Sequence, residues 1–435
     1  MTSAIESAKN SAITGLQIRT VLFCLVLNMI DGADVLLVAY AAPLFSDQWG
    51  VTPQALGLIF SAGLAGMTLG AVLVAPFSDV FGRKTMILFA TLLIAGGMAL
   101  SSLSKNVEAL MGYRLLVGLG IGSMLASVTA LSSEYAPVRF RSLAVTVAVS
   151  GYPLGAIVAG FVSVAVLPAV GWQGLFLYAS VVSLIMFPLC LAFMPESMDF
   201  LLARQPRNAL ARTNRIRAAT GLELMASLPS PSDHRQKVPG VNQLMAPEFR
   251  SKSLLLWGAF FAAFMTLYFL TSWIPKIAVD AGLSIDNAIY AGTAFNLGAF
   301  IGLWVIGWVS SAGVKLTSII AGFFVTSTFG MVLFGAFHTP ILVFFLEIFF
   351  IGFLIQGGFG GMYAVAARQY PTVIRTTGVG WALGAGRLGA VFGPYLGGLT
   401  IGWGVSFLGN FMIFAAPMAV AAVFIALVGR KPESS

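Results

Sequence analysis

The chain has 435 residues, of which 58% are hydrophobic and 9% are charged, and its mean hydropathy is +0.92. This composition excludes a soluble globular protein and indicates a membrane protein with several spanning segments. The formal net charge of +8 does not indicate a nucleic-acid partner, because the basic residues fall almost entirely in alternate connecting segments.

Apolar stretches of roughly 20 residues, the length that crosses a bilayer as a helix, occur along the whole chain. Six lie near residues 18–44, 54–77, 84–103, 108–132, 142–168 and 173–194. Six more lie near residues 253–279, 287–310, 316–336, 340–366, 377–400 and 405–429. We therefore expect an all-α membrane protein with twelve transmembrane helices in two six-helix halves. The halves are residues 1–194 and 253–435, each with a short terminal tail, and a polar central segment, 195–252, joins them.

Basic residues predict how these segments are oriented. The central segment holds Arg204, Arg207, Arg212, Arg215, Arg217, Arg235, Lys237, Arg250 and Lys252. With twelve helices, most other basic residues fall on the same side, and only Lys105 and Lys276 fall on the opposite side. The positive-inside rule places the central segment and both termini in the cytoplasm. We expect a multi-pass protein of the cell inner membrane that functions as a monomer in the lipid bilayer.

The first apolar segment carries two carboxylates, Asp31 and Asp34, separated by Gly32 and Ala33. A charge near the centre of a spanning helix costs roughly 2.5 to 3.5 kcal/mol on insertion scales, so two charges within one turn indicate a function. Their i, i+3 spacing places them on one helical face, where repulsion and poor solvation favour the protonated form of at least one carboxyl. We assign proton coupling to both, because the spacing does not say which one titrates. A polar cluster that packs helices is the alternative.

The loop after the second segment reads Ala75-Pro-Phe-Ser-Asp79-Val-Phe-Gly82-Arg83-Lys84. It resembles the loop signature of the major facilitator superfamily. That resemblance implies a latch, formed by Asp79, Gly82, Arg83 and Lys84, which biases the inward-open and outward-open states. The alternative is that Arg83 and Lys84 only orient the chain.

The two halves repeat at an offset of 234 residues. This offset aligns Gly118 with Gly352, Pro137 with Pro371, Arg141 with Arg375, and Gly155 with Gly389. Two six-helix units in the same orientation, related by an axis along the membrane normal, are typical of transporters that rock about a site at the midplane. Glu134 and Arg141, at the end of the fourth segment, and Arg375, at the start of the eleventh, are further latch candidates.

More specific motifs narrow the resemblance. They are Arg114-Leu-Leu-Val-Gly118-Leu-Gly120-Ile-Gly122, Glu134-Tyr-Ala-Pro137-Val-Arg139-Phe-Arg141, Pro195-Glu196-Ser197, Asp31-Gly-Ala-Asp34 and Gly386-Arg387-Leu-Gly389. Together they resemble the aromatic acid:H+ symporter family of the major facilitator superfamily, over essentially the whole chain. The resemblance implies alternating-access import of benzoate-like or phenylpropanoid acids with a proton, and the major facilitator fold. We expect no cofactor and no metal.

Three ionisable residues within the apolar segments are further candidates. Arg387, midway along the eleventh segment, needs an anionic partner, and its guanidinium can hold a substrate carboxylate bidentately or pair with a carboxylate of the first helix. Arg114 either contacts substrate or pairs with a nearby acidic residue. Glu347 is a second protonation site or the structural partner of an intramembrane arginine.

Aromatic and amide side chains in the segments supply weaker candidates for substrate binding. Tyr152 occupies the repeat position that matches Arg387 within one residue, and Trp273 can stack on an aromatic ring, although packing or an interfacial role is an alternative for Trp273. Asn296, Gln356 and Trp381 are candidates for lining the cavity.

An enzyme is excluded, because the only histidines, His234 and His338, lie in expected loops without catalytic company. The glycine-rich runs lie in spanning segments and lack a P-loop lysine, which excludes a phosphate-binding loop. A channel is disfavoured because the repeat and the latch imply moving halves. A porter of another organic acid or of a sugar and a drug or metabolite efflux antiporter remain as alternatives.

Overall fold

The structure, a computed structural model, describes residues 13–229, 241–311, 315–336 and 340–430. The two histidines lie outside these ranges. The first half consists of α2 (Gly15–Trp49), α3 (Pro53–Leu69), η1 (Gly70–Val74), η2 (Ala75–Phe77), α4 (Ser78–Phe81), α5 (Arg83–Ser102), α6 (Val107–Tyr135), η3 (Val138–Phe140), α7 (Arg141–Val149) and α8 (Gly151–Phe193). Then come α9 (Met198–Arg204), α10 (Ala209–Ala219), α11 (Val241–Leu244), α12 (Pro247–Asp280), α13 (Ile285–Ser311), α14 (Leu316–Ala336), α15 (Ile341–Gln369), α16 (Thr372–Gly402) and α17 (Phe407–Val428).

The number of membrane spans follows from these helices. Within the described residues, ten helical stretches are long and apolar enough to cross a membrane, and one of them, Arg141–Phe193, has 53 residues. At about 1.5 Å per residue this stretch is far longer than a bilayer core of about 30 Å. It is broken at Gly171, which has a φ of 65°, and therefore makes two spans. With α16, which packs between α12 and α3, the total is the twelve helices that the sequence predicts.

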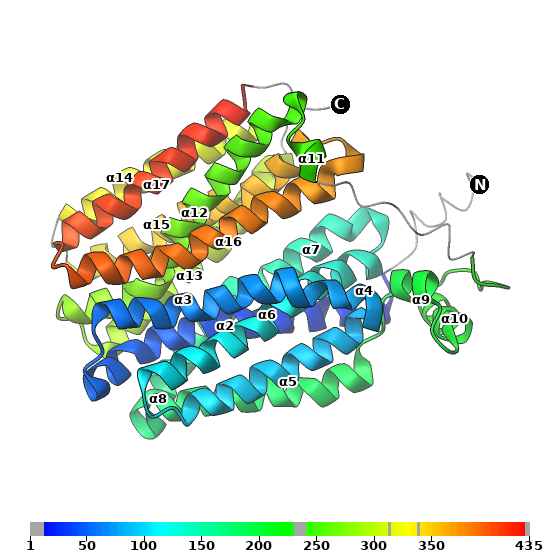
Figure 1. Ribbon diagram of the computed structural model, residues 1–435, viewed down its shortest axis with the longest axis horizontal. Coiled ribbons are helices and arrows are strands. Elements are labelled where there is room, and N and C mark those ends of the chain that lie inside the picture. The colour runs from blue at the N-terminus through cyan, green and yellow to red at the C-terminus, as the bar shows by residue number, and fades with distance from the viewer. Residues whose placement is uncertain (1–12, 230–240, 312–314, 337–339, 431–435) are drawn as a thin grey trace.

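The helices form two groups, as Figure 1 shows: α2 to α8 lie below, and α12 to α17 lie above. Glycines allow the closest approaches at equivalent places in both groups. A Cβ on Gly118 would overlap the carbonyl of Gly63, and a Cβ on Gly352 would overlap the carbonyl of Phe295. Because Gly118 and Gly352 align at the 234-residue offset, the packing of α6 on α3 is repeated by the packing of α15 on α13.

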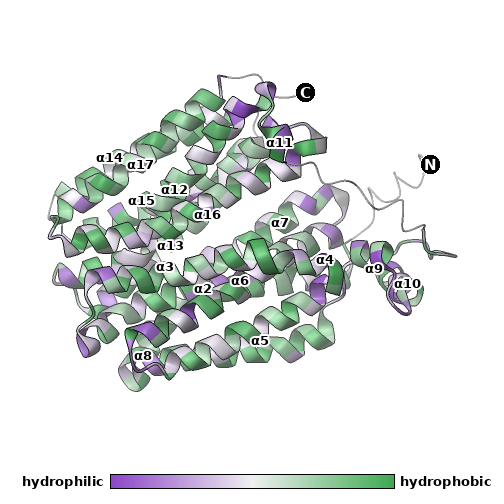
Figure 2. Cartoon of the chain, viewed as in Figure 1, coloured by the Kyte–Doolittle hydropathy of each residue, from purple (hydrophilic) through white to green (hydrophobic). Residues whose placement is uncertain are grey.

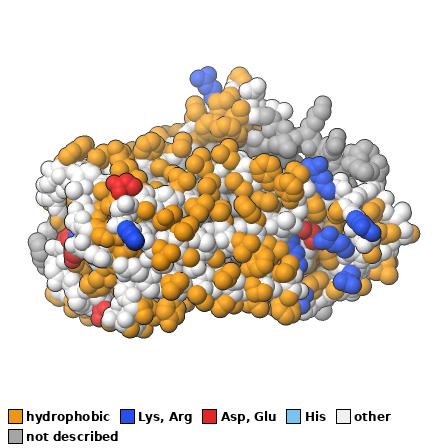
Figure 3. All heavy atoms as spheres, turned by 60° about the horizontal axis from the view of Figure 1, so that its bottom comes forward, with side chains coloured by type: hydrophobic (Ala, Val, Ile, Leu, Met, Phe, Trp, Pro, Cys, Tyr) orange, Lys and Arg blue, Asp and Glu red, His pale blue; other side chains and the backbone are white. Residues whose placement is uncertain are grey.

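The surface divides into an apolar belt and a basic end. Figure 2 shows predominantly apolar long helices, with polar colour concentrated on α9, α10 and the helix ends. Figure 3 shows hydrophobic side chains over the middle of the molecule and Lys and Arg side chains gathered toward the end that carries α9 and α10. We call this the α9 end and the opposite one the far end. The separation matches the charge pattern on which the predicted orientation depends.

The two groups touch each other in the far-end part of their helices. The Ser61 hydroxyl on α3 donates to the Val391 carbonyl on α16 at 2.7 Å. The Phe60 ring meets the Trp273 ring edge-on at 5.4 Å. Gly398 of α16 lies so close to α3 that an added Cβ would be 2.5 Å from the Pro53 carbonyl oxygen. These contacts hold the far end closed in this structure.

Replacing Gly398 with valine is expected to open the far end, because the valine side chain would need space that the α3 backbone occupies. Spin labels at Val51 and Val405, in the α2–α3 and α16–α17 loops, would report a longer distance in pulsed electron resonance. Gly96→Val is the control, since nothing lies within 4 Å of a Cβ there. An unchanged distance distribution in Gly398→Val would contradict this account of the closed end.

Candidate functional site

One carboxylate and one guanidinium, each near the middle of a spanning helix, lie near each other across the interface between the two groups. Asp31 lies near the middle of α2 and is 2% exposed. Arg387 lies midway along α16, and the two charges interact electrostatically. They are not in contact as an ion pair: Asp31 Oδ1 and Arg387 Nη1 are both buried without a hydrogen-bond partner. One carboxylate oxygen of Asp31 and one guanidinium nitrogen of Arg387 therefore remain available to a ligand.

Tyrosine hydroxyls surround this pair. Tyr268 on α12 makes polar side-chain contacts with Arg387 and with Tyr152 on α8. Tyr363, six residues before the end of α15, interacts electrostatically with Arg387 and is 38% exposed. A guanidinium and three hydroxyls supply enough donors to hold a carboxylate, which accepts hydrogen bonds at both oxygens.

Aromatic rings of α12 and α15 build one wall beside Arg387. Phe264 and Phe359 meet edge-on with ring centroids 4.6 Å apart, and Phe359 meets Tyr363 at 5.3 Å. Phe264 also stacks on Tyr268 at 5.8 Å. A Cβ on Gly386, next to Arg387, would meet the Phe264 ring, so the wall lies directly against α16. Such a wall suits a planar aromatic ligand.

Asp34 points to a different partner from Asp31. Arg114 on α6 donates to both of its oxygens, with Nη1 to Oδ1 at 2.7 Å and Nη2 to Oδ2 at 2.5 Å. Both side chains are nearly inaccessible, at 3% and 2% exposed. This bidentate geometry is the arrangement that best compensates two buried charges. The structure therefore separates the two carboxylates into a paired one and an unpaired one.

The remaining candidates for substrate and proton binding are spread over the second half. Trp273 is buried, and its Nε1 donates to the Pro394 carbonyl at 3.0 Å, in the closed far end. Asn296 is buried and donates to the Gly292 carbonyl of its own helix at 2.9 Å. Trp381 is 48% exposed and stacks on Trp257. Glu347 is partly buried on α15. Gln356, also on α15, has a buried Oε1 without a hydrogen-bond partner.

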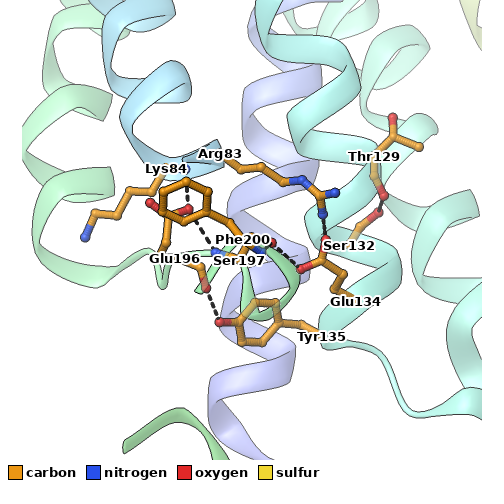
Figure 4. Close-up of polar contacts among 9 residues, drawn as sticks. All are labelled: Arg83, Lys84, Thr129, Ser132, Glu134, Tyr135, Glu196, Ser197 and Phe200. Carbon is orange, nitrogen blue, oxygen red and sulfur yellow. Dashed lines mark hydrogen bonds and ion pairs between the residues drawn. The ribbon is translucent and has the colours of Figure 1, made fainter. Parts of the chain in front are cut away.

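At the α9 end, the structure brings several latch candidates together with residues that the sequence prediction did not include. Figure 4 shows Arg83 of α5 reaching Glu134 of α6, with which it forms an ion pair. The other carboxylate oxygen of Glu134 accepts from the Ser197 hydroxyl at 2.7 Å. Ser197 caps α9, because its hydroxyl also accepts from the Phe200 N–H at 3.1 Å. This network of latch candidates thus connects α5, α6 and the start of α9.

Glu196 holds the centre of the same network. Its carboxylate accepts from the Lys84 backbone N–H at 3.0 Å, and its carbonyl accepts from the Tyr135 hydroxyl at 2.6 Å. Lys84 Nζ donates to the Leu191 carbonyl at 2.7 Å. A carboxylate at the first turn of α5 is also stabilised by the helix dipole. Glu196 therefore ties the segment after α8 to the first turn of α5 and to the end of α6.

Gly82 makes this contact sterically feasible. Its φ is 96°, a conformation that side chains disfavour, and an added Cβ would lie 2.5 Å from Glu196 Oε2. Gly82→Ala is expected to lower the free energy of unfolding by about 1–3 kcal/mol, the usual cost of such strain. Thermal unfolding in detergent measures it, with Gly112→Ala as the control because a Cβ meets nothing within 4 Å there. Equal stability of the two variants would contradict this role.

The other predicted latch residues lie at the edge of the network. Asp79 is exposed on α4, and its backbone carbonyl accepts from Arg204 Nε at 2.9 Å. Arg141 is exposed at the start of α7. Arg375 Nε donates to the Tyr370 carbonyl at 3.3 Å within the second half.

Tyr268, Tyr363 and Glu196 are the functional candidates that the sequence prediction missed. Glu196 stands in the Pro195-Glu196-Ser197 motif, which was a usable signal. The two tyrosines carry no comparable signal, because they stand among many aromatic residues in apolar segments. Among the described residues, no group of three or more His, Cys, Asp or Glu side chains could hold a metal ion.

The chain is similar in sequence to known transporters. Residues 22–363 match the model of the Major Facilitator Superfamily. The 4-hydroxybenzoate transporter PcaK of Acinetobacter baylyi is 33% identical, covering 92% of this chain and 89% of its own length. The gallate transporter of Pseudomonas putida is 32% identical, covering 97% and 94%.

The fold is shared with a solved transporter. The xylose transporter XylE from E. coli, in a partially occluded inward open conformation, superposes with a TM-score of 0.73. The two are 16% identical, and the match covers 97% of this chain and 99% of XylE. The predictions of the major facilitator fold and of a chain that is not an enzyme are confirmed. The chain belongs to the major facilitator superfamily and, within it, to the aromatic acid:H+ symporter family.

Proposed function

We propose that this protein imports a small aromatic carboxylate together with a proton by alternating access. The observation that carries the proposal is the set of Asp31, Arg387 and three tyrosine hydroxyls beside an aromatic wall, in the middle of the membrane between the two halves. An anion site, a titratable group and a surface for a planar ring thus lie together. The relatives that carry 4-hydroxybenzoate and gallate support a benzoate-like substrate.

Coupling arises because Asp31 and the substrate carboxylate compete for the same positive charge. While Asp31 is ionised, it attracts Arg387 and repels an incoming anion. When Asp31 takes up a proton, the full charge of Arg387 becomes available to the substrate, and the tyrosine hydroxyls add hydrogen bonds. Each ligand therefore raises the affinity for the other, as linkage requires.

The transport cycle moves the two halves against each other. Residues 1–194 and 253–435 rock about the central site, and the 195–252 segment joins them in the cytoplasm. The basic α9 end faces the cytoplasm in the cell inner membrane, as do both termini. The closed far end would then face outward, and the transporter would act as a monomer. The Arg83–Glu134 and Glu196 contacts join α5, α6 and the segment before α9, and they would serve as the latch that biases the cycle toward one state.

Asp34 contributes to coupling through Arg114. The bidentate pair fixes Asp34 against Arg114, so a movement of Arg114 would change the contacts of Asp34 during the cycle. Glu347 is a further protonation site, outside the group around Arg387.

Uptake into proteoliposomes tests the proposal. Radiolabelled 4-hydroxybenzoate is expected to accumulate above its external concentration when an inward proton gradient is imposed, and to equilibrate without one. Benzoate, 3-hydroxyphenylpropionate, xylose and an efflux dye are compared under the same conditions. Uphill uptake of xylose or of none of the acids would contradict the substrate class, and equal uptake with and without the gradient would contradict proton coupling.

A further inference from the structure

A polar side chain without a partner lies on the same helix as the aromatic wall. Gln356 Oε1 on α15 is buried and has no hydrogen-bond partner. A buried acceptor that is left unpaired costs about 1–3 kcal/mol in free energy relative to a paired one. An unpaired acceptor of this kind in a membrane-spanning helix indicates that a ligand supplies the missing hydrogen-bond donor.

Helix geometry places Gln356 in line with the residues of the proposed site. Seven residues separate it from Tyr363, which corresponds to almost two full turns, so both point to the same side of α15. Phe359 lies between them on that face, and its ring forms the wall with Phe264. Tyr363 lies in the electrostatic neighbourhood of Arg387. Along α15, from its C-terminal end, Tyr363 beside Arg387 comes first, the Phe359 ring of the wall follows, and the unpaired amide oxygen of Gln356 comes last.

This order matches one class of aromatic acid. A benzoate held by its carboxylate at Arg387, with its ring on Phe359, presents the substituent opposite the carboxylate away from the charged end. The rise from Tyr363 to Gln356 is about 10 Å, which is comparable to the length of one hydroxylated benzoate with a hydrogen bond at its end. A hydroxyl at that ring position would donate the hydrogen bond that Gln356 Oε1 lacks.

We propose that Gln356 recognises a ring hydroxyl opposite the carboxylate, so that the protein selects para-hydroxylated benzoates over unsubstituted benzoate. The inference rests on the proposed function, because it takes the substrate carboxylate to bind at Arg387. Discrimination follows from the unpaired amide. An unsubstituted ring buries that acceptor without a donor, whereas a hydroxylated ring satisfies it.

Gln356→Met tests this directly, because methionine keeps the unbranched shape of the side chain and removes the amide. Competition against radiolabelled 4-hydroxybenzoate in proteoliposomes gives the apparent affinities of 4-hydroxybenzoate, 3-hydroxybenzoate and benzoate. We expect the wild type to prefer 4-hydroxybenzoate over benzoate. The substitution should reduce this preference roughly 5-fold to 10-fold, the loss of one hydrogen bond, and should leave the affinity for benzoate unchanged or higher.

Two further variants separate this role from damage to the fold. Gln369→Met makes the same change on the same helix, where Oε1 is also buried without a partner but lies 13 residues from Gln356, at the end of α15. It should keep the preference. Phe359→Leu should lower the affinities for 4-hydroxybenzoate and benzoate equally, because it alters only the ring wall. An equal loss for both acids in Gln356→Met would overturn the inference while leaving the proposed function standing. Failure of the wild type to bind any aromatic acid would overturn the proposed function itself.

Discussion

Replacing Arg387 with glutamine is expected to weaken binding of an aromatic carboxylate by at least roughly 30-fold. Removing one partner of a desolvated charge pair costs about 2–5 kcal/mol, and 1.4 kcal/mol corresponds to a factor of ten. The reason is specific to this site, since Arg387 Nη1 is buried and has no protein partner. Isothermal titration of detergent-solubilised protein with 4-hydroxybenzoate measures the change.

The matched control is Arg430→Gln, at an exposed position beyond α17. It should bind as the wild type does. Arg387→Lys should recover only part of the affinity, because an ammonium keeps the charge but lacks the planar fork. Unchanged binding in Arg387→Gln would place the carboxylate elsewhere and would contradict the site described above.

The second large effect concerns stability rather than binding. Asp34→Ala or Arg114→Met alone is expected to lower the free energy of unfolding by about 3–5 kcal/mol, because each leaves the other charge buried and unpaired. Changing both residues together should recover most of this loss, since no uncompensated charge remains. Thermal and denaturant unfolding in the same detergent, arranged as a double-mutant cycle, gives the coupling energy.

Strictly additive losses in this cycle would contradict a direct pair between Asp34 and Arg114. The cycle also distinguishes the two carboxylates of the first helix. Asp31→Ala should cost far less stability than Asp34→Ala, because Asp31 has no ion-pair contact to lose.

The sequence predicts the twelve spans because hydropathy and charge set them directly. The lengths of the apolar segments, the basic residues between them and the 234-residue repeat all indicate the same architecture. The one place where helices merge, Arg141–Phe193, is interrupted at Gly171 between two segments that hydropathy separates. Spanning helices are thus predictable because a bilayer imposes their length and composition.

The division of roles between Asp31 and Asp34 could not be predicted from spacing. Residues three apart differ by about 60° around a helix, and this rotation directs Asp34 toward α6 and Asp31 toward α16. Which helix stands on which side is a matter of tertiary packing. For the same reason, the sequence did not decide whether Arg114 contacts substrate or pairs with an acidic residue. Its partner in the structure, Asp34, is 80 residues away in the chain.

Sequence motifs contain most residues of the latch candidates' network, but they do not contain the tyrosines of the proposed ligand site. Arg83, Glu134 and Glu196 stand in short recognisable motifs, and the structure brings them within one network. Tyr268 and Tyr363 were missed because a tyrosine in an apolar segment gives no signal until its neighbours in space are known. A site between two halves is formed by residues of many helices, so no local sequence pattern predicts which residues belong to it.

The most direct test of proton coupling is to compare two transport modes in Asp31→Asn. Proteoliposomes with this variant are expected to lose accumulation of 4-hydroxybenzoate driven by a proton gradient, yet still to exchange labelled for unlabelled substrate. Asparagine mimics the protonated carboxyl and leaves Arg387 free for the substrate. Asp47→Asn, an exposed position on the same helix, should accumulate substrate as the wild type does. Gradient-driven accumulation by Asp31→Asn at the wild-type level would contradict the central claim that Asp31 carries the coupled proton.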